Sequence, residues 1–141
     1  MDDLAVISAC LQDALIPVGD IAYLPQEKSF VLVANRFRWE GDRRATIGAE
    51  GCERILSLVA FDAVEGVLYR GFRRDARERL LSLLAVRPEI EGDRDGGAIH
   101  LDFSGGAGIR LTVGRILCRL KDVGLPWPTA WRPAHDLGER P

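Results

Sequence analysis

Two arginines, two residues apart, are the most distinctive candidates for chemistry in this chain. Arg36 and Arg38 stand in the run 30–40, between Asn35 and Trp39. An arginine guanidinium is a planar fork that binds a carboxylate or a phosphate through two parallel hydrogen bonds. Because alternate residues of a strand share one face, both arginines are expected on the same side. Tryptophan and arginine also dominate interface energetics, so the same run suits protein binding.

The first half of this run, from Phe30 to Ala34, is apolar on both faces and is predicted to cross a core. The second half is predicted to emerge at the surface, because one of its faces is doubly cationic. Asn35 falls on the apolar face, between Val33 and Phe37. A buried amide needs a hydrogen-bond partner, so we expect a structural role for Asn35, such as capping a bulge or a loop backbone.

The two histidines are candidates for acid–base chemistry. His100 and Asp102 share a strand face, and His135 is followed by Asp136. A histidine–carboxylate pair can act as a general base with its orienting group, or supply two ligands to a metal. Because His100 and Asp102 lie on the polar face of an amphipathic strand, solvated charges are the simpler interpretation. We therefore expect no catalytic residue, no metal ligand and no cofactor.

Arginines are densest between residues 70 and 79. They are Arg70, Arg73, Arg74, Arg77 and Arg79. With Phe72, Trp39 and the arginines of the first run, they suit an arginine–aromatic face for single-stranded nucleic acid. The net charge of −2 opposes that function, because nucleic-acid-binding domains usually carry a basic excess. We expect a solvated loop or a short helical turn, and nucleic acid is not an expected partner.

An amphipathic helix is predicted at the N-terminus. Asp2 or Asp3 can cap it, and apolar residues recur at spacings of three and four up to Leu15. Pro17 and Gly19 are predicted to end it. A helix of this length is marginal alone and needs a surface to lie on.

Alternating apolar residues predict about seven antiparallel strands after the helix. The clearest hairpin joins 21–24 to 30–39 across a tight turn at 25–28. Residues 115–123 suit either a C-capped helix or a strand that continues from Val113, and a short internal sequence echo favours the strand. The remaining strands are expected at 54–61, 64–69, 80–86, 99–103 and 109–113. Ile90 follows the run 80–86, and Pro88 marks an edge or a bend there.

The glycine-rich segment 104–108 is predicted to connect a hairpin. A phosphate loop follows a strand, opens a helix and carries a lysine. Here a strand is predicted to follow, and the segment has no lysine.

Length and composition bound the class of protein. A chain of 141 residues, with 47% apolar and 28% charged residues, suits one globular domain. Its three cysteines, Cys10, Cys52 and Cys118, are widely spaced, which favours a reducing compartment over a disulfide framework. The sequence shows neither a signal-peptide pattern nor the apolar run of about 20 residues that spans a bilayer. We expect a cytoplasmic protein with no membrane partner, folded over 1–126 and ending in an irregular tail at 127–141.

Two segments carry a family resemblance. One runs from Leu24-Pro25 to the hexapeptide 35–40, Asn-Arg-Phe-Arg-Trp-Glu, and the other from 120–127 to Arg-Pro-Ala-His at 132–135. On these motifs the chain resembles a small bacterial family catalogued as a domain of unknown function, number 2948, over nearly its whole length. The resemblance implies no assigned activity, cofactor or catalytic residue.

The predicted elements give an α+β fold, in which the N-terminal helix packs on a mostly antiparallel β-sheet. A curled sheet, a barrel or a two-sheet roll would each bury both components. A pleckstrin-homology-like barrel is one such arrangement, taken as an analogy.

The leading functional hypothesis is a non-enzymatic binding or adaptor module that docks a protein partner or a second copy of the chain. Its predicted binding residues are Arg36, Arg38, Trp39, Trp127, Arg132 and His135. The alternative is a small-anion-binding protein or enzyme, in which Arg36 and Arg38 clamp a carboxylate or phosphate. His100 or His135 is then the acid–base group.

Overall fold

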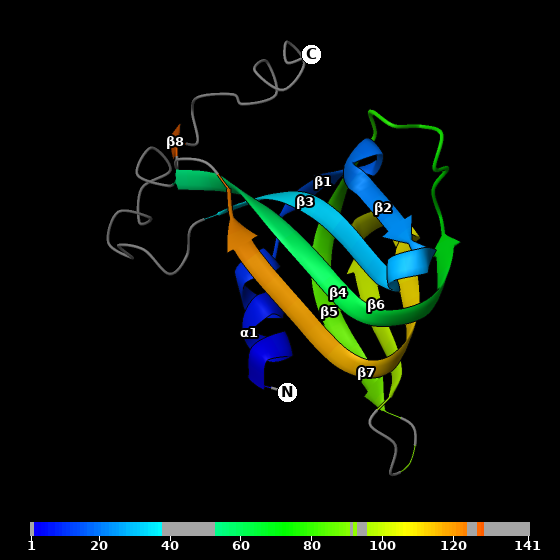
Figure 1. Ribbon diagram of the computed structural model, residues 1–141. Helices are drawn as coiled ribbons and strands as arrows, with labels where there is room; N and C mark the ends of the chain where they lie inside the picture. Colours follow the sequence, from blue (N-terminus) through cyan, green and yellow to red (C-terminus); the bar gives the residue numbers. More distant parts are fainter. Residues whose placement is uncertain (1, 38–52, 91, 93–95, 124–126, 129–141) are drawn as a thin grey trace.

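The computed structural model describes residues 2–37, 53–90, 92, 96–123 and 127–128. One helix precedes a mostly antiparallel sheet, so the expected α+β fold class is confirmed (Figure 1). The helix and strands are α1 (Asp2–Leu11), β1 (Leu15–Pro17), β2 (Ile21–Leu24), β3 (Ser29–Phe37), β4 (Glu53–Arg70), β5 (Leu80–Ile90), β6 (Gly97–Phe103), β7 (Gly108–Asp122) and β8 (Trp127–Pro128). Short 3-10 turns connect some of them at η1 (Val18–Asp20), η2 (Pro25–Glu27) and η5 (Ser104–Gly106).

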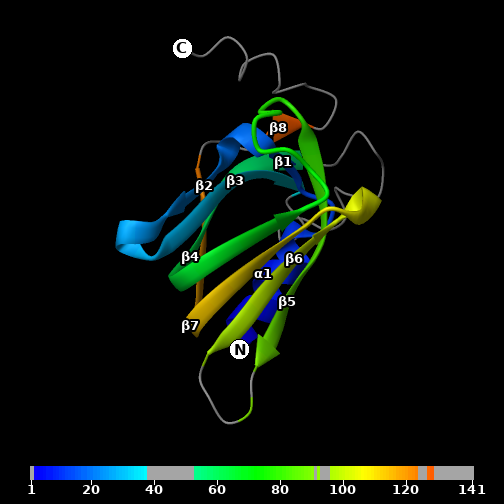
Figure 2. The ribbon, with the colours of Figure 1, turned by 90° about the vertical axis from the view of Figure 1, so that its right-hand side faces the viewer.

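Six of the strands close into a barrel. Around it the order is β3-β1-β5-β6-β7-β4, and β4 pairs with β3 from Phe30↔Phe61 to Phe37↔Arg54. β2 and β8 lie outside the closed ring, β2 paired with β3 and β8 with β4. Figures 1 and 2 show the strands curling around a common interior, with α1 against β5 and β7.

The first half of β3 crosses the core, as its apolar pattern predicts. Phe30, Leu32 and Ala34 are buried, and the Phe30 ring lies 6.3 Å from the ring of Phe61 on β4, centre to centre. Removal of this apolar surface from water is the dominant favourable contribution to folding. The clearest predicted hairpin, β2 with β3, is present around η2.

β4 is one long strand where the apolar pattern predicts two. Its pairing with β7 shifts register between Asp62 and Gly66, and Ala63 has a φ of 58°, in the left-handed region. A bulge of this kind bends a strand and increases its twist. The first half of β4 can therefore follow β3, while the second half turns with β7 to end at Arg70.

The N-terminal helix ends earlier than predicted. α1 stops at Leu11, and Leu15–Pro17 forms β1 in place of a last helical turn. Asp13 has a φ of 67°, which a helix does not accommodate. The backbone of this segment pairs with β5 instead: the Asp13 N–H donates to the Leu83 carbonyl oxygen (2.8 Å), and the Leu83 N–H to that of Ala14 (2.9 Å).

α1 packs its apolar face onto the barrel. Leu4, Ile7 and Leu11 are buried in the same core as the strands. The Ser8 hydroxyl accepts a hydrogen bond from the Val86 N–H (3.0 Å), just beyond the register shift between β5 and β6. No helix within the described residues is both long and apolar enough to cross a membrane.

The second predicted hairpin, β6 with β7, is also present. η5 connects it across the glycine-rich segment, where Gly105 has a φ of 77°. Residues 115–122 continue β7 as a strand, and Leu117 to Asp122 pair with the first half of β4, from Asp62↔Leu117 to Ser57↔Asp122. The strand interpretation of this ambiguous segment is therefore confirmed.

Candidate functional site

Arg36 lies inside the protein, with a side chain that is 1% exposed. Its Nε donates to Ser57 Oγ (2.8 Å), and its Nη2 donates to both carboxylate oxygens of Asp122 (2.8 and 3.0 Å). Its Nη1 donates to the carbonyl oxygen of Phe37 (3.2 Å). The Ser57 hydroxyl in turn donates to Asp122 Oδ1 at 2.6 Å. These bonds replace the water that a guanidinium loses on burial.

The expectation that Arg36 emerges at the surface is therefore wrong. Its face of β3 stays buried from Phe30 to the end of the strand. A guanidinium is tolerated there because β4 supplies Ser57 and β7 supplies Asp122 as acceptors. Arg36 thus ties three strands of the barrel together, and its donors are turned to protein acceptors.

Asn35 is paired with an arginine on the neighbouring strand. Arg54 Nε donates to Asn35 Oδ1 (2.5 Å), and Arg54 Nη2 donates to the Asn35 carbonyl oxygen (2.8 Å). The Arg54 guanidinium carbon lies 4.0 Å from the centre of the Phe37 ring. The half-buried amide of Asn35 has a partner, as it requires. That partner is a side chain, where a bulge or loop backbone was expected.

Most of the other predicted binding residues lie outside the described residues. They are Arg38, Trp39, Arg132 and His135. Trp127 belongs to β8, which pairs with the start of β4 through Arg54↔Trp127 and Glu53↔Pro128. β8 therefore lies at the end of the barrel where β3 ends. The arginine–tryptophan surface as a whole stays a prediction.

His100 lies among charged side chains on the outer face of β5 and β6. Its Nε2 is 2.6 Å from Glu89 Oε1, and this hydrogen bond lowers the pKa of Glu89. Asp102 pairs with Arg87 instead, and that hydrogen bond holds the pKa of the Asp102 carboxyl below its usual range. Within the described residues, no group of three or more His, Cys, Asp or Glu side chains could hold a metal ion.

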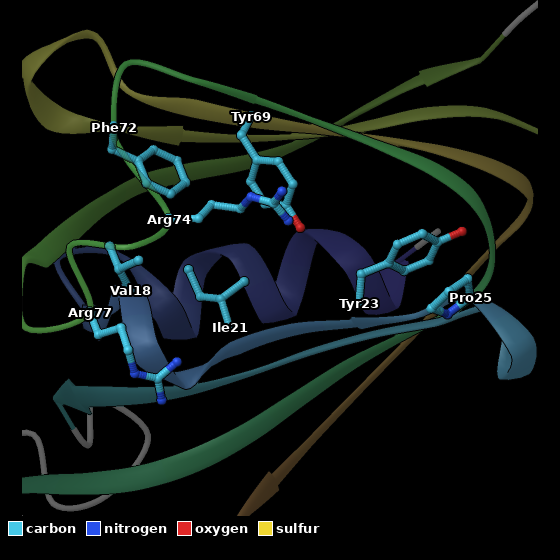
Figure 3. A pocket seen from close by; sticks show the side chains of 8 residues that line it. All are labelled: Val18, Ile21, Tyr23, Pro25, Tyr69, Phe72, Arg74 and Arg77. Atoms are coloured by element: carbon cyan, nitrogen blue, oxygen red, sulfur yellow. The ribbon is translucent and has the colours of Figure 1, made fainter.

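A pocket of about 350 Å³ opens between β2 and the connection from β4 to β5 (Figure 3). We call it the mouth pocket. Its lining residues are Val18, Ile21, Tyr23, Pro25, Tyr69, Phe72, Arg74 and Arg77.

Six of the eight residues that line the mouth pocket are apolar or aromatic, and the other two are arginines. Figure 3 shows Ile21 and Tyr23 of β2 on one side, with Tyr69 and Phe72 on the other. Tyr69 and Phe72 pack edge to face, with ring centres 5.9 Å apart. The Tyr23 hydroxyl donates to the Val64 carbonyl oxygen (3.3 Å). The aromatic rings are therefore held by contacts with the barrel itself.

Two arginines of the predicted cationic run line the mouth pocket. The Arg74 guanidinium carbon lies 4.5 Å from the centre of the Tyr69 ring, within cation–π range. Arg77 Nη2 donates to the Gly19 carbonyl oxygen (3.3 Å). The approach is close, because a Cβ added at Gly19 would lie 3.1 Å from the Arg77 Cβ. Both guanidinium groups are exposed to solvent and positioned by the pocket wall.

The other arginines of this run have different partners. Arg73 binds both carboxylate oxygens of Asp75 (3.0 and 2.7 Å), and Arg79 donates to the Gly71 carbonyl oxygen (3.3 Å). The sequence identified the run, but it did not predict a pocket, because Ile21, Tyr23 and Tyr69 come from strands expected only to build the core. A usable signal was the pair of tyrosines, whose hydroxyls suit a surface better than a core.

A family model described as a protein of unknown function, DUF2948, matches residues 1–135. No curated protein and no solved structure matches the chain. The pleckstrin-homology-like arrangement therefore stays a prediction, and the geometry of the mouth pocket carries the functional argument.

Proposed function

The chain belongs to the DUF2948 family of proteins of unknown function, and on that premise we propose that it is a non-enzymatic binding module for a small organic anion. The ligand occupies the mouth pocket. One observation carries this proposal: Arg74 and Arg77 line a pocket of about 350 Å³ together with apolar and aromatic residues. This volume is within the range of small-molecule sites, about 300–1,000 Å³.

The two kinds of lining residue suit the two ends of such a ligand. A guanidinium offers paired N–H donors to a carboxylate or phosphate. The rings of Tyr69 and Phe72 offer a flat apolar surface to an aromatic or other apolar group. This proposal keeps the anion of the small-anion hypothesis but assigns it to Arg74 and Arg77, since Arg36 is committed to Ser57 and Asp122.

Binding is favoured over catalysis by the chemistry of the lining. Its described side chains include tyrosine and arginine but neither histidine nor carboxylate. His100 is paired with Glu89 on the outer face of the sheet. A general acid or base must come within about 3 Å of the reacting atoms. The lack of histidine and carboxylate among the described lining residues therefore supports a role in holding a ligand.

Calorimetric titration with benzoate and phenyl phosphate tests the proposal. Benzamide is the neutral control, because it matches benzoate in shape without its charge. We expect the anions to bind and benzamide to bind at least about tenfold more weakly, since hydrogen bonds to charged groups are worth about 1.5–3 kcal/mol.

A pair of double variants separates the pocket from general charge. Arg74→Gln with Arg77→Gln removes both guanidinium groups and should lower the affinity for benzoate at least about tenfold. Arg115→Gln with Arg119→Gln makes the same change of charge at exposed positions outside the pocket and should leave the affinity unchanged. Equal losses in both, or no binding of either anion at millimolar concentration, would refute the assignment.

A second binding role is supported by the position of β8. We propose that Arg38, Trp39, Trp127, Arg132 and His135 dock a protein partner, with a second copy of the chain as the first candidate. The support is the pairing of Trp127 with Arg54, next to the end of β3. Sedimentation of the wild type and of a variant with Arg38→Ala and Trp39→Ala should show loss of self-association in the variant. Identical sedimentation of the two would remove this surface.

We place this binding module in the bacterial cytoplasm. The odd number of cysteines supports a reducing compartment, as does Cys118, which is a free thiol. Nucleic acid is not proposed as a partner, because the net charge is −2.

A further inference from the structure

β2 has one open edge. Its four residues pair with β3 from Ile21↔Leu32 to Leu24↔Ser29, and no other described strand pairs with it. An unpaired edge presents backbone N–H and C=O groups that can pair with another extended chain. Proteins commonly bind peptides in this way, by adding a strand to a sheet.

The open edge of β2 points in the same direction as the edge of β1 that pairs with β5. β1 and β2 both pair with the edge of β3 that is not taken by β4. Their outer edges therefore face the same way. The outer edge of β1 carries β5, through pairs from Leu15↔Ser82 to Pro17↔Leu80.

Backbone pairing along this side stops where the mouth pocket begins. The N–H groups of Val18 and Gly19 donate to the carbonyl oxygens of Arg79 and Arg77, each at 2.9 Å. Within the described part of the chain, no such bond continues from 71–76 to β2. The next residues along this side are Ile21 and Tyr23, whose side chains line the mouth pocket. The mouth pocket therefore lies where a further strand would pair with β2.

We propose that the anion bound in the mouth pocket is carried by an extended peptide segment of a protein partner, which pairs with the open edge of β2. This inference rests on the proposed function and names the partner for the same site. The backbone of the peptide binds the edge of β2, while one of its side chains enters the mouth pocket.

The period of a strand determines which peptide fits. Side chains two positions apart point to the same face, about 6.6 Å from each other. One inward side chain meets Arg74 and Arg77 and is therefore acidic. Its inward neighbour meets Tyr69 and Phe72 and is therefore apolar. The recognised segment is an extended run with a glutamate or aspartate two positions from a leucine, valine or aromatic residue.

Fluorescence anisotropy with labelled peptides tests this inference on the full chain. The probe is a capped hexapeptide of threonines in which one leucine and one glutamate stand two positions apart. We expect it to bind at least about tenfold tighter than acetyl-glutamate amide, which carries the same carboxylate without a strand. A glutamine version should bind at least about tenfold more weakly than the probe.

Backbone methylation gives the decisive control. In a paired strand only alternate N–H groups point to the neighbour. Two peptides are therefore made, N-methylated at the odd or at the even positions, with unchanged side chains. One should lose at least about tenfold in affinity, since two backbone hydrogen bonds are removed, and the other should bind as the parent does.

The combined results for benzoate and the hexapeptide distinguish failure of the peptide proposal from failure of the small-anion function. If benzoate binds but the hexapeptide binds no tighter than acetyl-glutamate amide, the peptide inference is wrong and the small-anion function stands. Equal affinities for the parent and both methylated peptides would also overturn it. If neither benzoate nor the hexapeptide binds, both proposals fall.

Discussion

A buried guanidinium needs acceptors that replace its water, and Arg36 has them on two neighbouring strands. Ser57 and Asp122 accept from it, and these two side chains are also bonded to each other. Arg36 and Ser57 are buried, while the Asp122 carboxylate is 38% exposed. Removing the Arg36 side chain takes a charged donor from both acceptors and leaves space inside the barrel. The cost is expected to be much larger than for an ion pair at the surface.

We predict that Arg36→Ala lowers the free energy of unfolding by about 2 kcal/mol or more. The matched control is Arg119→Ala, which removes an arginine that is 70% exposed and paired with Asp62 (3.2 Å). Its expected cost is below about 1 kcal/mol. Urea denaturation of the two variants measures both values. A loss at Arg36 no larger than at Arg119 would show that the buried bonds contribute little.

The environment of Arg36 could be predicted only in part from the sequence. The alternation correctly groups Arg36 with Phe30, Leu32 and Ala34, but a charged residue at the end of a strand usually marks solvent. Its partner Asp122 is 86 positions away along the chain. No local sequence pattern identifies an acceptor at that separation, so only the structure could reveal that Arg36 is buried.

Cys118 gives a prediction about pH. Burial raises the pKa of this thiol to about 12, with the Asp62 carboxylate adding to the effect. A raised folded-state pKa means that the neutral thiol stabilises the fold below the unfolded-state pKa, about 8.5. That contribution is lost as the pH rises from about 8.5 towards 12.

Native Cys118 should therefore resist alkylation at about pH 8.5. Reaction with iodoacetamide, followed by mass spectrometry of the Cys118 peptide, should be slow in the folded protein and fast in urea. Similar rates in both states would contradict the burial of this thiol.

At the scale of elements, the connection between β4 and β5 determines the mouth pocket. It begins at Gly71, which has a φ of +83° and packs against the end of the β6–β7 hairpin. A Cβ there would lie 2.8 Å from the Ala107 Cα and 2.9 Å from the Gly106 carbonyl oxygen. Glycine is therefore required both by conformation and by space, and it sets the path that places Arg74 and Arg77.

We predict that Gly71→Ala destabilises the protein and weakens benzoate binding, since the backbone must shift at the start of the connection. Gly105→Ala is the matched control. Gly105 has a similar φ of +77°, but no atom lies within 4 Å of its added Cβ. It should show only the conformational cost, about 1 kcal/mol, and unchanged binding. Equal effects of the two on binding would mean that the position of this connection is unimportant.

The elements themselves were largely predictable, because their apolar periods are clear. Both hairpins and the helix follow from the sequence, whereas the segment 115–123 suited a strand or a helix until its pairing with β4 was seen. The bulge at Ala63 and the early end of α1 do not, since each depends on distant backbone partners. Val64 bonds to Lys28, and Asp13 bonds to Leu83. Local propensity is overridden at such places by tertiary pairing.

For the whole molecule, closure of the barrel positions both the mouth pocket and the end of the barrel at β8. β1 has three residues, yet it joins β3 to β5 and so completes the ring. Pairing between β4 and β7 and between β3 and β4 supplies most of the remaining wall. The order of strands around the barrel is set by these long-range contacts, which no single segment encodes. The position of the mouth pocket could not be predicted for the same reason, although its two tyrosines gave a signal.

Our proposed function requires that the mouth pocket binds an organic anion through Arg74 and Arg77. Nuclear magnetic resonance titration of the isotope-labelled protein with benzoate tests it most directly. The guanidinium Nε–H signals of Arg74 and Arg77 and the backbone amides of Tyr23, Tyr69 and Phe72 should move together, with one dissociation constant. Unmoved signals at these residues, or changes confined to other parts of the barrel, would show that the mouth pocket does not bind the anion.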